Sequence, residues 1–342
     1  MIKYPQKLKN GDTIGITAVS DGANLLKIDR AISNLKELGF CVIETPNTRN
    51  SFMCVSSDGK TRAKEFITLW KDPNVKHILS ARGGEFLMEM LPYLDEYADV
   101  LKNPDSIKWV QGYSDPSLLL FYLTTKYHIA MIHAENLSEF AMNLEHYHPC
   151  LKNTISFLKS EDIEFVQTSF DKFQLQEFEE GNLNGYQLTE NVKYEILGSK
   201  DTHIAVEGRL IGGCVDVLAL LMGTKFDTCS SFCSQFSEGM IWYLDNCELN
   251  AAELYRRLWK MRELGWFSNA NAFLIGRTFS GQAVQDFTYL EALKKALYDL
   301  NVPIIYNADI GHVPPQLTLI NGAFAKVEFL QGKIKLIQKL IP

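Results

Sequence analysis

Short apolar runs alternate with amphipathic segments along the first part of the chain. Residues 12–19, 40–44 and 75–80 are rich in branched aliphatic side chains, which is typical of buried strands. Between these runs, apolar residues recur every three or four positions, which predicts helices near residues 28–38 and 61–70. Strands that alternate with helices predict a parallel sheet with helices on both faces. In such a sheet, ligands bind beyond the carboxyl ends of the strands.

A strand, a tight corner and a helix follow one another within residues 107–126, IKWVQGYSDPSLLLFYLTTK. The corner runs from Gly112 to Asp115. Pro116 suits the first position of a helix, where Asp115 would cap the free amides. This order brings Ser114 to the tip of the corner, as in the nucleophile elbow of serine hydrolases. The elbow pattern is incomplete, because Pro116 stands where a second glycine is usual. A serine in an ordinary capped turn fits the same residues.

The second half of the chain contains further strands that end in polar residues. Residues 240–244 form an apolar run that ends at Asp245, so this carboxylate would be held at the edge of a sheet. Residues 302–306 form another apolar run, and the loop that follows contains His312 among glycine and proline residues. Loops after strands are where catalytic side chains tend to lie.

The length of 342 residues is sufficient for two domains. A polar, acid-rich stretch separates the two groups of strands. We therefore expect an N-terminal domain over residues 1–165, a passage over residues 166–200 and a C-terminal domain over residues 201–342.

Composition and charge exclude several classes of function. The net charge is −7, both signs are mixed along the chain, and no basic patch contains interleaved aromatic residues, which argues against a nucleic-acid partner. No apolar run is long enough to predict a membrane span, and the N-terminus does not resemble a signal peptide, so we expect a cytoplasmic protein. Seven scattered cysteines give neither a disulfide framework nor metal-ligand spacing, and we expect reduced thiols and no metal.

The Ser114 hydroxyl becomes a nucleophile at neutral pH only when a base takes its proton and a third group orients that base. His312 is the histidine whose position in a loop after a strand best suits a base. Asp245, Glu248 and Glu207 are the candidates for the orienting acid, and their spacing alone does not choose among them. Glu207 precedes the glycine-rich stretch 208–213, which we expect to form a turn.

Two adjacent glycines follow the strand at residues 75–80. A backbone amide at Gly83 or Gly84 could then complete an oxyanion hole with the amide of Asp115, at the start of a helix. A simple turn is the other interpretation of this glycine pair.

Several motifs in collinear order together resemble the LD-carboxypeptidase family, the serine peptidases that include the microcin C immunity peptidases. The opening GDTIGITAVS and the strand IWYLDNCELN are similar to corresponding strands of that family. The motifs that carry the resemblance are RGGEF (82–86), GYSD (112–115), EGRLIGGC (207–214) and GHVPPQLTLINGA (311–323).

The resemblance implies roles for individual residues. Ser114 matches the family nucleophile, His312 matches the base, and Asp245 takes the place of the acid. The family has a glutamate at that place, so either the backbone lies closer here, or Glu248 substitutes, or the site is weakened. A second departure is Glu85, where the family often has an aromatic residue.

The resemblance also implies substrate contacts. The substrate carries a free carboxylate, so a cation is required. Arg82 and Arg277 are the candidate cations, and Glu207 is placed with them among the substrate-binding residues. Gly84 and Asp115 would supply the oxyanion hole.

The implied fold is an α/β protein with an N-terminal flavodoxin-like parallel sheet and a C-terminal β-rich swivelling domain. The implied activity is hydrolysis of an amide next to a carboxylate, without a cofactor, in a muropeptide or a peptide-nucleotide antibiotic of the microcin C type. Many family members form dimers, and we extend this expectation to a homodimer here. A noncatalytic binding protein on the same scaffold and another α/β hydrolase, such as an esterase, are the rival interpretations.

Overall fold

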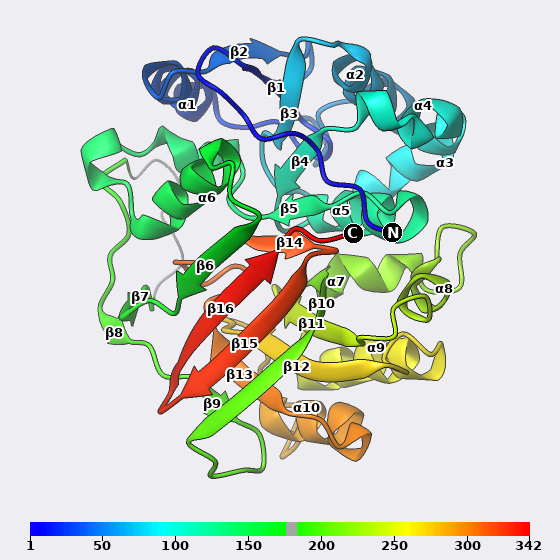
Figure 1. Cartoon of the computed structure of the whole chain (residues 1–342), viewed down its shortest axis with the longest axis vertical. Coiled ribbons are helices and arrows are strands. Elements are labelled where there is room, and N and C mark those ends of the chain that lie inside the picture. The colour runs from blue at the N-terminus through cyan, green and yellow to red at the C-terminus, as the bar shows by residue number, and fades with distance from the viewer. Residues whose placement is uncertain (176–182) are drawn as a thin grey trace. The chain divides into compact units, whose positions relative to one another are not determined.

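The computed structural model describes residues 1–175 and 183–342, which form two compact units (Figure 1). The N-terminal unit comprises Met1–Asp162, residues 183–185 and Pro342, and the C-terminal unit comprises residues 163–175 and Tyr186–Ile341. Most of the expected passage over residues 166–200 therefore belongs to the C-terminal unit, while its residues 176–182 lie outside the described part of the chain.

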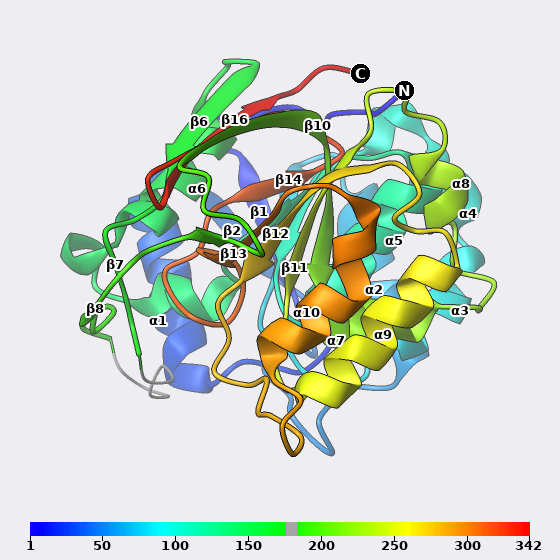
Figure 2. The same ribbon diagram turned by 90° about the horizontal axis from the view of Figure 1, so that it is seen from below.

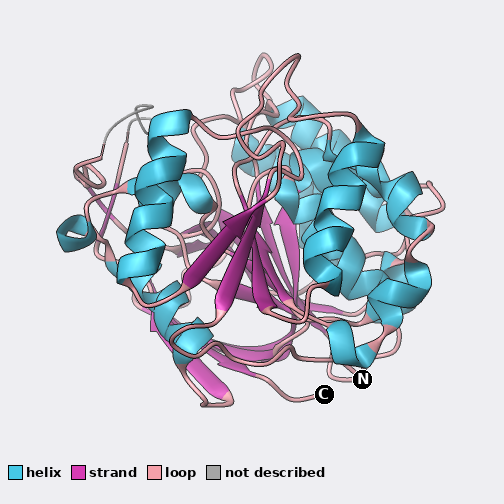
Figure 3. Ribbon diagram, turned by 90° about the horizontal axis from the view of Figure 1, so that it is seen from above, coloured by secondary structure: helices cyan, strands magenta, loops and turns pink. Residues whose placement is uncertain are grey.

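The N-terminal unit contains a parallel sheet in which its strands follow the order β5-β4-β3-β1-β2. The central strands are buried on both faces because helices cover both, which explains their continuous apolar runs (Figure 3). The strands are β1 (Thr13–Thr17), β2 (Cys41–Glu44), β3 (Val75–Ser80), β4 (Trp109–Gly112) and β5 (Met131–His133).

The helices of the N-terminal unit begin at recognisable caps. Asn24 accepts a hydrogen bond from the amide of Leu26, and Asp58 accepts one from the amide of Thr61. The α-helices are α1 (Leu25–Glu37), α2 (Gly59–Lys71), α3 (Leu91–Asp95), α4 (Ala98–Lys102), α5 (Pro116–Tyr127) and α6 (Pro149–Lys159), and the 3₁₀ helices are η1 (Leu87–Met90), η2 (Pro104–Ser106), η3 (Leu137–Ala141) and η4 (Leu144–His146).

The C-terminal unit contains a mixed sheet in the order β6-β16-β15-β10-β11-β12-β13-β9. Strands β10 to β13 run parallel, and the outer strands on both sides are antiparallel. Strands β7 and β8 of this unit form a separate two-stranded sheet, and β14 also lies outside the mixed sheet. The strands of the unit are β6 (Glu164–Thr168), β7 (Lys172–Phe173), β8 (Glu190–Asn191), β9 (Glu195–Ile196), β10 (His203–Cys214), β11 (Met240–Asp245), β12 (Ala270–Gly276), β13 (Ile304–Ala308), β14 (Leu319–Asn321), β15 (Phe324–Leu330) and β16 (Lys333–Lys339).

Helices α9 and α10 lie side by side in this unit (Figure 2). Helix α9 begins with a capping box, in which Asn250 and Glu253 each accept a hydrogen bond from the other's backbone amide. The helices of the unit are α7 (Val215–Leu218), α8 (Cys229–Cys233), α9 (Ala251–Glu263) and α10 (Tyr289–Leu297), with 3₁₀ helices η5 (Ala219–Leu221) and η6 (Tyr298–Leu300).

The two sheets confirm the predicted α/β class with a parallel N-terminal sheet and a β-rich C-terminal part. One local prediction is wrong. The glycine-rich stretch 208–213 was expected to be a turn, but it lies inside strand β10. A Cβ atom at Gly212 would collide with the carbonyl oxygen of Tyr243 in the neighbouring strand, so glycine serves close approach between strands here.

None of the helices in the described ranges is both long and apolar enough to span a membrane.

Candidate active site

Ser114 lies between the end of β4 and the start of α5, at the predicted corner. Its φ angle is +66°, a left-handed conformation that is uncommon for residues other than glycine. The side chain of Asn136 fixes this corner, because its amide group exchanges two hydrogen bonds of 3.3 Å with the backbone of Tyr113. A strained residue held by its surroundings is typical of functional sites. Ser114 therefore has the backbone geometry of a nucleophile elbow.

Asp115 does not cap α5 with its side chain, contrary to the sequence prediction. Its buried carboxylate accepts hydrogen bonds from the hydroxyl of Ser20, after β1, and from the amide of Leu87, after β3. Burial raises the pKa of Asp115 to about 6, although these two hydrogen bonds oppose the increase. Asp115 thus connects the three loops that follow β1, β3 and β4.

The loop after β3 packs against the serine corner. A Cβ atom added to Gly83 would lie 2.9 Å from the Ser114 Oγ atom, and one added to Gly84 would collide with the Ser20 Oγ atom. Gly84 also has a φ angle of +153°, which other residues rarely adopt. Among the described residues, the amides of Gly84 and Asp115 have no hydrogen-bond acceptor. Both remain able to bind an oxyanion.

Arg82 precedes these glycines in the same loop. Its side chain is 45% exposed, and its Nη1 atom lies 3.7 Å from the Oδ2 atom of Asp21. The guanidinium therefore remains accessible to a carboxylate in solution.

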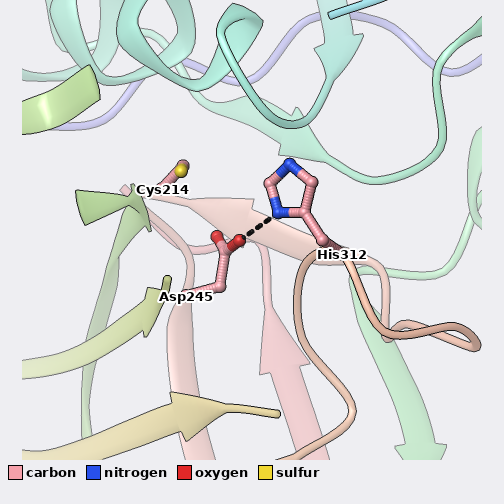
Figure 4. Close-up of side chains that lie close together, drawn as sticks. All are labelled: Cys214, Asp245 and His312. Atoms are coloured by element: carbon pink, nitrogen blue, oxygen red, sulfur yellow. Dashed lines mark hydrogen bonds and ion pairs between the residues drawn. The ribbon is translucent and has the colours of Figure 1, made fainter. Parts of the chain in front are cut away.

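Asp245 and His312 form a hydrogen-bonded pair within the C-terminal unit (Figure 4). Asp245 ends strand β11 and is buried, and His312 lies in the loop after β13. The His312 Nδ1 atom is 2.7 Å from the Asp245 Oδ2 atom. Burial lowers the pKa of His312, but the charge of Asp245 and its hydrogen bond more than offset this, so the pKa is raised well above its usual value. A buried carboxylate therefore orients and polarises this imidazole.

Two glycines allow the short aspartate to reach the ring. A Cβ atom at Gly311 would collide with the Asp245 carboxylate, and one at Gly276 would lie 3.0 Å from the Asp245 Cβ atom. Gly311 has a φ angle of +85°, which favours glycine. The backbone next to His312 therefore passes directly against Asp245, so a longer acid is not needed to span the distance.

The other two candidate acids lie elsewhere. Glu248 is exposed, and its backbone amide donates a hydrogen bond to Asp216. Glu207 is exposed on β10, seven residues before Cys214 at the end of that strand, which corresponds to about 23 Å along the strand. Asp245 is the acid that contacts His312, and Glu207 is not near this pair.

Arg277 is buried in an ion pair, with its Nη2 atom 2.5 Å from the Asp309 Oδ1 atom. Its guanidinium also donates hydrogen bonds to the carbonyl groups of Asn307 and Pro315, at the two ends of the loop that contains His312. This placement favours a structural role, in which Arg277 holds the loop that contains His312. It does not favour the substrate contact that the sequence position of Arg277 suggested.

Two thiols lie beside the pair, whereas the sequence predicted only scattered reduced cysteines. Cys214 is buried at the end of β10, in register with Asp245 on β11. Cys247 is partly buried and lies close enough to His312 for the two side chains to interact electrostatically. Burial raises the pKa of Cys247, and the contact with His312 opposes this increase. The sequence did contain a signal for both thiols near the site. Cys214 ends the EGRLIGGC motif, and Cys247 follows Asp245 by two residues.

Comparison with known proteins identifies both units. Residues 14–134 match the LD-carboxypeptidase N-terminal domain, and residues 207–327 match the LD-carboxypeptidase C-terminal domain. The chain is 26% identical to a Bacillus subtilis protein named as a carboxypeptidase, YocD, over 96% of this chain and 97% of the relative. It is 24% identical to the Escherichia coli microcin C7 self-immunity protein MccF, over 97% of this chain and 94% of that protein.

Solved structures show the same fold. The microcin C7 self-immunity protein MccF in complex with aspartyl sulfamoyl adenosine matches with a TM-score of 0.82 and 22% identity over the full length of both chains. An MccF-like protein from Bacillus anthracis matches with a TM-score of 0.80 and 23% identity, over 98% of this chain and 99% of the other. With both domain models matched in their natural order, the chain belongs to the LD-carboxypeptidase family of peptidases.

Proposed function

We propose that this protein is a serine carboxypeptidase that cleaves an amide next to a terminal carboxylate. Ser114 is the nucleophile, His312 is the general base and Asp245 orients the imidazole. The observation that carries the proposal is the 2.7 Å hydrogen bond between Asp245 and His312, because a histidine oriented by a buried carboxylate is the base used by serine hydrolases. The left-handed conformation of Ser114 at the end of β4 is the second support.

The reaction follows from these roles. The Ser114 Oγ atom attacks the amide carbonyl carbon, and its proton passes to the Nε2 atom of His312. The amides of Asp115 and Gly84 stabilise the oxyanion, and His312 then protonates the leaving amine. An acyl-enzyme on Ser114 remains. His312 next takes a proton from water, and the hydroxide attacks the ester. As the bond to Ser114 breaks, His312 returns that proton to the serine oxygen, so the acid product leaves and both groups are regenerated.

Arg82 is the cation that we assign to the substrate carboxylate. It lies in the loop whose glycines contact Ser114 and Ser20, and its side chain is partly exposed. A guanidinium binds a carboxylate through two parallel hydrogen bonds, so Arg82 would select substrates that end near the cleaved bond. Arg277, in contrast, positions the His312 loop.

The L,D amide bond of a muropeptide is the first candidate substrate. A peptide-nucleotide of the microcin C type is the second, since a relative that aligns with 97% of this chain is named as a microcin C7 self-immunity protein. Both substrates present an amide to the same catalytic groups, so direct assay separates them.

The test compares hydrolysis of an L,D-tetrapeptide with hydrolysis of an aminoacyl sulfamoyl adenosine by the purified protein. Ser114→Ala should abolish turnover of the preferred substrate and leave the fold intact, because the side chain is small. Ser156→Ala, at an exposed serine on α6 of the same unit, is the matched control and should remain active. Full hydrolysis by Ser114→Ala would refute the nucleophile assignment, and inactivity of the wild type on both substrates would favour a binding protein.

A further inference from the structure

Three potential metal ligands meet at the Asp245–His312 pair (Figure 4). Cys214 and Asp245 end adjacent parallel strands and are paired in register, while His312 comes from the loop after β13. One ligand atom from each residue lies within 4.8 Å of the others. All three belong to the C-terminal unit, so its own fold brings them together.

The chemistry of this set suits a soft divalent cation. Thiolate, imidazole and carboxylate are the usual ligands of zinc, with bond lengths of about 2.0–2.3 Å in a tetrahedral arrangement. Ligand atoms in such a site are about 3.3–3.8 Å apart, so a side-chain movement of about 1 Å would bring the three atoms into range.

Asp216 holds the Cys214 thiol from behind the site. Its carboxylate accepts a 3.4 Å hydrogen bond from the Cys214 thiol and a 3.0 Å hydrogen bond from the backbone amide of Cys247. A carboxylate that orients ligands from behind is a recurring feature of metal sites. The peptidase roles assigned above need neither cysteine, so the arrangement calls for a different explanation.

We propose that Cys214, Asp245 and His312 form a binding site for a soft divalent cation such as Zn²⁺. On binding, the Cys214 thiol releases its proton to solvent and its sulfur bonds to the metal. The cation occupies His312 and Asp245, so it inhibits the enzyme and is not a cofactor. This inhibition rests on the proposed function, whereas binding does not.

Titration of the purified full-length protein with Co²⁺ tests binding without any hydrolysis. We expect one ion per chain and the charge-transfer absorption of a thiolate bound to cobalt, reversed by Zn²⁺. Cys214→Ser should weaken binding at least about 100-fold, since even residues behind the ligands contribute 10–100-fold. Cys229→Ser is the matched control, because Cys229 and Cys233 form a separate buried thiol pair with sulfur atoms 3.9 Å apart.

The outcomes are distinct. The site is refuted if the wild type shows no thiolate absorption with Co²⁺, or if the absorption survives in Cys214→Ser. Loss of the absorption in Cys229→Ser alone would instead assign the metal to the Cys229–Cys233 pair. Should Cys214→Ser not fold, Cys214→Ala and a rise in the melting temperature of the wild type with Zn²⁺ provide the same decision. Failure of the protein to hydrolyse either substrate leaves the cobalt result unaffected, so the two proposals are tested separately.

Discussion

Individual residues decide how the acid and the base meet. Asp245 reaches His312 because Gly276 and Gly311 have no side-chain atoms in the space that the Asp245 side chain occupies. The difference from the family glutamate is thus accompanied by a close backbone approach, which was one of the three alternatives that the sequence left open.

Asp245→Glu should therefore reduce activity, although it restores the acid that is usual in the family. The extra methylene has no space against Gly311, so it would displace the His312 loop. We expect a decrease in kcat/KM of about 10²-fold, the typical cost of a misplacement near 1 Å. Asp245→Asn should cost about 10⁴-fold by comparison with other triads. Wild-type activity in Asp245→Glu would show that the backbone yields easily.

Gly83→Ala tests the contact between the loop after β3 and the proposed nucleophile, Ser114. The added methyl group would lie 2.9 Å from the Ser114 Oγ atom, and the φ angle of Gly83 is not in the left-handed region, so crowding of Ser114 is the main effect. We expect kcat/KM to fall about 10²-fold with a nearly unchanged melting temperature. An unaffected rate would mean that the hydroxyl has space to move aside.

At the scale of elements, the carboxylate of Asp115 joins the segments that follow three parallel strands. The pKa of this group is raised from its usual value near 3.8 to about 6, mainly by burial. The folded state therefore binds the proton more tightly than the unfolded state. The stabilisation is complete below about pH 4 and is lost as the pH rises through about 6.

Asp115→Asn removes this titration and keeps a side chain of the same shape. As the pH rises from about 4 to about 7.5, the wild type should lose stability relative to the variant. The difference between their free energies of unfolding should change by on the order of 3 kcal/mol. Denaturant unfolding at several pH values measures this difference. Glu135, whose pKa is raised to about 7 by burial, is present in both proteins and cancels. A difference independent of pH would contradict the assigned shift.

The elements themselves could largely be predicted, because their apolar periods are regular. The strand that became β3 was predicted with its observed bounds, and the corner around Ser114 was predicted from Gly112 and Pro116. Residues 208–213 were not predicted as part of a strand, because glycine is typical both of turns and of close contacts between strands. The close approach of Tyr243 in the neighbouring strand distinguishes the two, and it is visible only in the structure. The burial of Arg277 could not be predicted either, since its partner Asp309 lies 32 positions later in the sequence.

At the scale of the whole molecule, the proposed triad draws on both units. Ser114 belongs to the N-terminal unit, and Asp245 and His312 belong to the C-terminal unit. The sequence could predict these residues as candidates, because the motifs that contain them occur in the order that is typical of the family. It could not reveal Cys214 and Cys247 as neighbours of His312, because that proximity depends on the pairing of β10 with β11 and on the path of the loop after β13.

Reactivity of Ser114 should therefore depend on a residue of the other unit. A fluorophosphonate probe should label Ser114 in the wild type, and His312→Gln should slow the labelling by about 10²- to 10⁴-fold, the usual contribution of a general base. His146→Gln, at a partly exposed histidine of the N-terminal unit, is the control and should label normally. Equal labelling rates in His312→Gln and the wild type would contradict cooperation between the units.

Arg82 and Arg277, the two candidate cations for the substrate carboxylate, differ in their exposure to dissolved ions. The Arg277–Asp309 pair is almost fully buried, so dissolved salt screens it weakly and the support of the His312 loop persists over a wide range of ionic strength. Arg82 is exposed, and its attraction for an anionic substrate decreases as salt is added. In the proposed peptidase, increasing salt should therefore act on substrate capture, seen as a higher KM, while the Asp245–His312 pair keeps its geometry and kcat is maintained.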